Sequence, residues 1–130
     1  MSAILANRAT HVAIRVIISA ALATSGIAHA YLYIHGYRQI STVGTAFLIQ
    51  GSAFIALAIL ILLGGPIWLN WLAALGALGS LIAFGLSRTV GLFGFIEHGW
   101  EPPYGPLTVI AQIIALVAIG AGYRVWGFGR

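Results

Sequence analysis

The chain has 130 residues, of which 61% are hydrophobic and only 6% are charged, and its mean hydropathy is +1.03. Soluble domains carry about 25% charged and about 45–50% apolar residues, so this composition excludes an ordinary soluble protein and indicates lipid as the solvent. The net charge of +4 comes from scattered arginines rather than from a basic stripe, so we expect no nucleic-acid partner. The length predicts a single domain, residues 1–130.

Four apolar segments follow one another, and each is close to the ~20 residues that cross a hydrocarbon core of about 30 Å. They run over residues 12–34, 43–63, 68–95 and 107–125, where the third is apolar to about Leu86, before Arg88, and its last part to residue 95 is an extension. The segments are too long for strands and do not alternate in polarity. A Gly-Gly-Pro turn at 64–66 and two other short links make neighbouring helices antiparallel. The sequence therefore predicts an all-α membrane protein, an up-down-up-down bundle of four transmembrane helices.

The arginines indicate how this bundle is oriented. Arg8 and Arg15 precede the first apolar run as in a signal peptide, but we expect that run to be retained as a helix. The side of the two termini holds Arg8, Arg15, Arg124 and Arg130, and the opposite side holds only Arg38 and Arg88. This excess predicts that both termini lie in the cytoplasm.

Polar side chains gather at the end of the predicted bundle away from the termini, which we call the distal end and expect to be the outer end. The candidate binding residues of this cluster are His29, His35, Arg38, Arg88, Glu97, His98 and Glu101. An unpaired Arg88 near hydrocarbon costs about 2.5–3.5 kcal/mol. Because Glu97 and Glu101 are the only carboxylate side chains, we predict that one of them forms an ion pair with Arg88. The alternative is an anion or head-group site at Arg88.

The histidines raise the question of a metal or haem. His29 lies on one helix stripe with Ala21 and Ser25, so we expect it to face the bundle interior and to bond a neighbouring helix. A metal site would use His29 and His98, because imidazoles with a carboxylate suit zinc, copper or iron. A b-type haem would need two histidines at similar depth on facing helices. No spacing demands either group, so the sequence requires no cofactor.

No catalytic pattern is present: the chain has no GxSxG, no phosphate-binding glycine loop and no carboxylate pair in a cleft. We therefore expect no catalytic residue and no enzyme activity of the chain alone. The first functional hypothesis is an accessory or structural subunit of a larger membrane complex, with the lipid bilayer and other membrane subunits as partners. The alternatives are a binding protein for a quinone, lipid, haem or metal ion at the distal cluster, and a small transporter or channel.

Three stretches carry motifs: Gly-x-x-His at 26–29, Gly-Tyr-Arg at 36–38, and Thr-Val-Gly-Leu-Phe-Gly-Phe-x-Glu at 89–97. With these motifs the chain resembles uncharacterised small bacterial four-helix integral membrane proteins, loosely DoxX-like, over about residues 22–120. The resemblance implies a four-helix fold in the bacterial cytoplasmic (inner) membrane and no particular activity. The chain departs from that pattern at Ala30, where the group has leucine.

Overall fold

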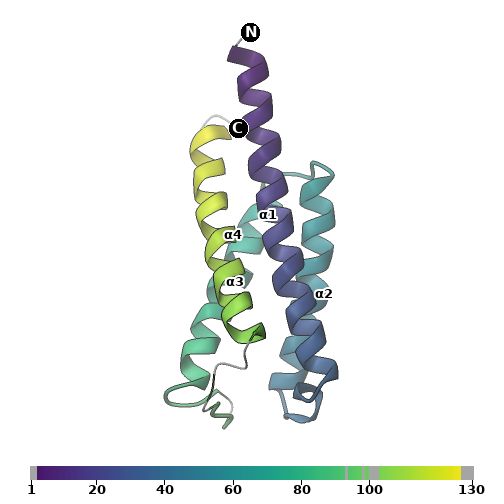
Figure 1. Cartoon of the computed structure of the whole chain (residues 1–130), viewed down its shortest axis with the longest axis vertical. Helices are drawn as coiled ribbons and strands as arrows, with labels where there is room; N and C mark the ends of the chain where they lie inside the picture. Colours follow the sequence, from purple (N-terminus) through teal and green to yellow (C-terminus); the bar gives the residue numbers. More distant parts are fainter. Residues whose placement is uncertain (1–2, 93, 98, 100–102, 127–130) are drawn as a thin grey trace.

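The computed structural model of the chain is an all-α bundle, as predicted, and it describes residues 3–92, 94–97, 99 and 103–126. Its elements are α1 (Ala3–Ile34), the 3-10 helix η1 (Tyr37–Gln39), α2 (Val43–Leu62), α3 (Trp68–Ser87) and α4 (Tyr104–Trp126). The four long helices run up and down along the long axis, and the start of α1 and the end of α4 lie at the same end (Figure 1). The loops after α1 and α3 form the distal end.

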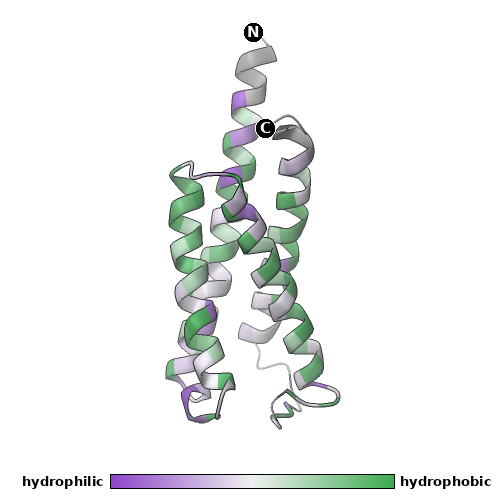
Figure 2. Cartoon of the chain, turned by 180° about the vertical axis from the view of Figure 1, so that it is seen from behind, coloured by the Kyte–Doolittle hydropathy of each residue, from purple (hydrophilic) through white to green (hydrophobic). Residues whose placement is uncertain are grey.

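All four long helices are long and apolar enough to cross a membrane. Hydrophobic residues cover most of their length, and hydrophilic residues gather near the two ends of the bundle (Figure 2). Large apolar side chains such as Ile49, Leu75 and Val117 are more than half exposed, as expected where lipid rather than water surrounds the helices. The protein is therefore a multi-pass integral membrane protein with four spans.

The third helix ends at Ser87, so its predicted extension to residue 95 is wrong. Gly91 and Gly94 have φ angles of +99° and +81°, which a right-handed helix does not contain. Beside these glycines the chain turns, and Leu92 and Phe95 exchange two backbone hydrogen bonds of 2.8 Å. Apolar composition alone did not reveal this break, because the turn is built from residues as hydrophobic as the helix.

Two other helices begin earlier than predicted. Helix α4 starts at Tyr104, so Pro106 lies in its first turn, where the missing N–H of proline leaves no hydrogen bond unmade. Helix α1 starts at Ala3 rather than near residue 12, and its first turns project beyond the other helices (Figure 1). Polar residues in these turns hid the helix from a search for apolar runs.

Helix α1 organises the packing, because it lies along both α2 and α4, whereas α3 packs less extensively against its neighbours. Small and apolar side chains from all four helices form the main core, which includes Ile18, Leu22, Phe54, Ala73, Ala77, Ala115 and Ile119. The backbones of α1 and α2 come close together at Gly26 and Gly51. A Cβ atom on either glycine would lie 3.0 Å from the carbonyl oxygen of the other. Glycine is required there for the two backbones to meet.

The Gly51→Ala substitution should destabilise the bundle, because the added methyl group forces α1 and α2 apart. Overpacking of this kind costs about 1–3 kcal/mol, measurable as a lower unfolding midpoint in detergent micelles. Gly79→Ala is the matched control: Gly79 is an exposed position on α3 where a Cβ meets nothing within 4 Å. It should leave stability unchanged or raise it by up to about 1 kcal/mol through helix propensity. Equal unfolding midpoints for both variants would contradict the close contact of the α1 and α2 backbones at Gly51.

Candidate functional site

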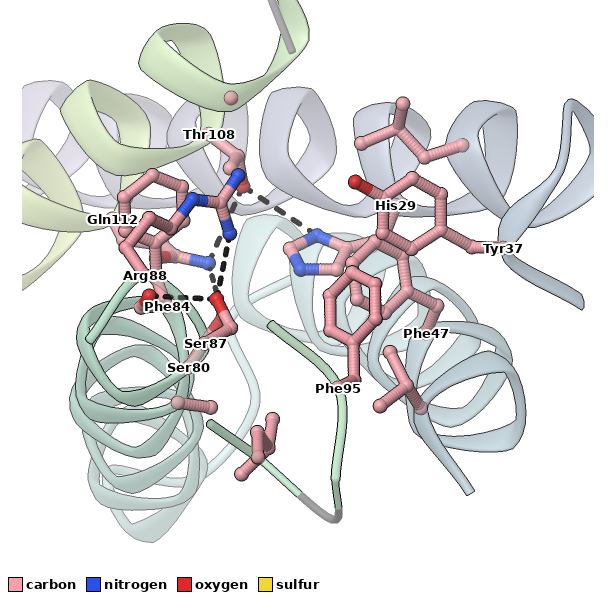
Figure 3. Close-up of a pocket in the computed structure, with 15 residues that line it drawn as sticks. His29, Tyr37, Phe47, Ser80, Phe84, Ser87, Arg88, Phe95, Thr108 and Gln112 are labelled. Carbon is pink, nitrogen blue, oxygen red and sulfur yellow. Dashed lines mark hydrogen bonds between the residues drawn. The ribbon is translucent and has the colours of Figure 1, made fainter. Parts of the chain in front are cut away.

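A pocket of about 70 Å³ lies at the distal end of the bundle, bounded by all four long helices, η1 and the loop after α3. This is room for several waters or a small head group, since one water needs roughly 10–15 Å³. Figure 3 shows its side chains: residues of α3 and α4 lie on one side, and aromatic rings lie on the other. The polar residues of the lining are His29, Ser80, Ser87, Arg88, Thr108 and Gln112.

His29 on α1 is 6% exposed and lies between the two sides of the pocket (Figure 3). Its Nδ1 is 2.8 Å from the carbonyl oxygen of Ser25, one turn earlier. A carbonyl can only accept, so Nδ1 carries the proton and Nε2 of the neutral ring is left as an acceptor. Nε2 points into the pocket and has no hydrogen-bond partner within the described part of the chain.

On the side of His29 away from the distal end, a buried polar network joins three helices. The amide nitrogen of Gln112 on α4 donates to Ser80 on α3 at 2.7 Å and to Ser25 on α1 at 3.1 Å. The hydroxyls of Ser25 and Thr108 are 2.7 Å apart, and Thr108 is itself 3.3 Å from the Gln112 nitrogen. Water is absent from the hydrocarbon region, so these groups satisfy one another. Gln112 therefore links α4 to both α1 and α3 through hydrogen bonds.

Aromatic rings form the wall on the other side. The ring of Phe47 on α2 lies 5.0 Å from that of His29, measured between centroids. Tyr37 of η1 stacks on Phe47 at 4.6 Å, and Phe95 of the loop meets Tyr37 edge-on at 5.9 Å. These contacts hold the pocket wall rigid and give it flat apolar faces.

Arg88 follows the last residue of α3 and lines the pocket while half-buried. One terminal nitrogen donates to the hydroxyl of Ser87 at 2.7 Å, and Nε donates to the carbonyl of Gly99 at 3.0 Å. Its guanidinium lies over the ring of Phe84, 3.8 Å from the centroid. Every one of these partners is uncharged, so none of them neutralises the positive charge of Arg88.

The described part of the loop after α3 lines the pocket through Leu92 and Phe95, and hydrogen bonds attach it to η1 and to α3. The hydroxyl of Tyr37 donates to Oε1 of Glu97 at 2.6 Å, a short charge-assisted bond. The backbone N–H of Glu97 donates to the carbonyl of Ser87 at 2.7 Å. Together with the bond from Arg88 to Gly99, these contacts place the loop over the pocket, with Phe95 against its wall.

The predicted distal cluster is thus only partly one site. His29 and Arg88 line the same pocket, and Glu97 holds the loop above it. His35 lies apart: it is exposed, stacks on Tyr31 and bonds the Tyr31 carbonyl. Arg38 is exposed on η1.

The predicted ion pair has a different outcome for each carboxylate. Arg88 and Glu97 each bond other groups, whereas a pair of Arg88 with Glu101 stays a prediction because Glu101 lies outside the described residues. His98 lies outside them too. Within the described ranges, no three metal-ligating side chains come together.

Sequence reasoning missed several residues of the pocket. Thr108 stands one turn before Gln112 on the same helix, and this i, i+4 spacing of polar residues was the available signal. Phe47 and Phe95 gave no such signal, because aromatic residues are common throughout the chain. Their place in the wall depends on contacts between elements far apart in sequence.

Comparison of the chain with protein-family models, with curated proteins and with solved structures gave no match. The class of the protein therefore rests on its own fold and composition: a four-span integral membrane protein with a pocket at the distal end.

The Gln112→Leu substitution should destabilise the bundle by about 1–2 kcal/mol, because it removes two interhelical hydrogen bonds that average roughly 0.6 kcal/mol each in membranes and strands buried hydroxyls. Thermal or denaturant unfolding in micelles measures the loss. Gln50→Leu serves as the matched control, since the half-buried Gln50 makes one long bond of 3.4 Å to the Gly76 carbonyl. If Gln50→Leu lowered the stability as much as Gln112→Leu, the polar network around Gln112 would contribute no more than a single long hydrogen bond.

Proposed function

We propose that the protein binds one amphiphilic small molecule of the membrane, with its polar head in the distal pocket and its apolar tail in lipid. The observation that carries this proposal is the acceptor Nε2 of the buried residue His29, which faces the pocket without a partner in the described chain. A polar atom at an apolar pocket inside a membrane bundle needs a hydrogen-bond partner from within that pocket. A ligand that donates to Nε2 would supply the one that this atom lacks.

The lining supports the same conclusion. Pockets for small molecules are mostly apolar and contain a few convergent polar groups that fix the orientation of the ligand. Here Phe47, Phe84 and Phe95 supply flat apolar faces, and His29 and Arg88 approach from different helices. This favours a lipid, or a quinone in its reduced, hydroxyl-bearing form, over the other ligands expected from the sequence. A porphyrin exceeds a pocket that holds several waters, and a metal ion needs further ligands beside His29, the one imidazole among the described residues of the lining.

A role as an accessory subunit stays a prediction, and one feature favours it. The first turns of α1 project beyond the other helices (Figure 1). Arg8 and Ala9 of this projection are exposed, so a neighbouring subunit could pack against it. Both roles are compatible, because a ligand-binding protein can also belong to a larger membrane complex.

The bound molecule should be found by mass spectrometry of protein extracted in mild detergent, at about one per chain. His29→Leu should lose it, because leucine keeps the volume and removes the acceptor. His35→Leu, which changes an exposed ring outside the pocket, should retain it. Added ligand at a hundred times its Kd should stabilise wild type by about 2.7 kcal/mol.

Absence of any bound molecule, together with no stabilisation by added lipids or quinones, would reject the binding role. The same extraction tests the accessory role, which requires a stoichiometric membrane partner to copurify.

We also infer that the termini lie in the cytoplasm of a bacterial cell and that the pocket opens outward. The excess of arginine near the termini supports this. The chain has no cysteine, so a single introduced cysteine is a unique reporter. Ser41→Cys, at an exposed distal position, should react with a membrane-impermeant thiol reagent in intact cells, and Ala9→Cys should react only after lysis. The reverse pattern would invert the orientation.

A further inference from the structure

We propose that the head group bound in the distal pocket is acidic, a carboxyl or phosphate group held between Arg88 and His29. This inference rests on the proposed binding function and adds the chemical class of the ligand. Its basis is the charge of the pocket together with the hydrogen-bonding capacity of its two facing polar groups.

The charge is carried by Arg88. Its partners in the described chain are a hydroxyl, a carbonyl and an aromatic ring, and none of these neutralises a guanidinium. The nearest described carboxylate by sequence, that of Glu97, accepts from Tyr37 and does not line the pocket. A positive charge in low-dielectric surroundings is unfavourable without a counter-charge. An oxyanion is the ligand chemistry that a guanidinium binds best, through charge-assisted hydrogen bonds.

The hydrogen bonds give the second argument. His29 offers an acceptor at Nε2, and Arg88 offers only donors. A singly protonated phosphate matches both, because its hydroxyl donates to Nε2 while a charged oxygen accepts from the guanidinium. A carboxyl group supplies the counter-charge only as a carboxylate, so it matches both when its proton resides on Nε2 and it accepts from the imidazolium and from the guanidinium. An alcohol would leave Arg88 without a counter-charge, and the two carbonyls of a quinone would leave Nε2 without a donor.

The size of the pocket agrees with a small head group. About 70 Å³ holds a group of a few heavy atoms, and the aromatic walls then lead to the apolar part of the ligand. Two sources share this chemistry: a fatty acid, which has a carboxyl group, and a lipid with a terminal phosphate. The experiment below separates them.

The test uses the full chain in detergent and three probes of equal chain length: a long-chain fatty acid, the alkyl phosphate and the alcohol. Affinities are measured by displacement of a fluorescent fatty acid and by the shift in melting temperature. At least one acid should bind about 10- to 100-fold more tightly than the alcohol, the ratio expected for one hydrogen bond to a charged group. The tighter of the two acids identifies the source.

Variants assign the effect to Arg88. Arg88→Gln should weaken the preferred acid about 10- to 100-fold and leave the alcohol unchanged, and Arg88→Lys should recover part of the loss. Arg38→Gln is the matched control, because Arg38 is exposed and outside the pocket lining. If Arg88→Gln does not fold, the comparison of acid with alcohol on wild type decides alone.

Three results would overturn the inference. Equal affinity for acid and alcohol rejects an acidic head group but leaves the binding function standing. No binding of any amphiphile rejects both. A ligand-free Glu101→Gln variant that melts as low as Arg88→Gln would show that the chain itself supplies the counter-charge. A Glu101→Gln variant with unchanged melting and unchanged acid affinity supports a ligand as that counter-charge.

Discussion

The amide of Gln112 is the contact on which the distal half of the bundle depends. Hydrocarbon offers no hydrogen bonds, so each polar group placed there needs a partner inside the protein. One side chain on α4 provides this for hydroxyls of both α1 and α3. Helix α3 otherwise packs less extensively than the other helices, so this bond helps to set its position. The position of α3 in turn places Phe84, Ser87 and Arg88 at the pocket.

The half of the bundle nearer the termini follows a different principle. There, small residues let the helices approach and apolar side chains fill the space between them. Two polar atoms are exceptions: Ser19 Oγ and Asn70 Oδ1 are buried without a hydrogen-bond partner among the residues that the structure describes. Each is a single polar group and not part of a hydrogen-bonded network. The polar network that joins helices is therefore a feature of the distal half, where the pocket lies.

The sequence was sufficient for the four helices and for the buried stripe of α1, because both follow from local periodicity and length. The stripe of Ala21, Ser25 and His29 is buried as predicted. It was not sufficient for the end of α3, where glycines with positive φ interrupt a run that remains hydrophobic. Nor did it yield the partners of Arg88. Electrostatics favoured a carboxylate, whereas the local geometry at the end of the helix places a serine hydroxyl, a backbone carbonyl and a ring within reach.

The pocket and the loop above it share residues, and this links ligand binding to the position of the loop. Arg88 lines the pocket and also holds the loop through Gly99. Tyr37 forms part of the wall and also fastens Glu97. A head group that enters the pocket therefore meets side chains that already have partners in the loop. The ligand must either bind alongside these hydrogen bonds or replace them. If it replaces them, the loop and the ligand compete for Arg88. If it binds alongside them, both stabilise the same position of the Arg88 side chain. A guanidinium has five N–H donors, enough to hold the carbonyl of Gly99 and an oxyanion together.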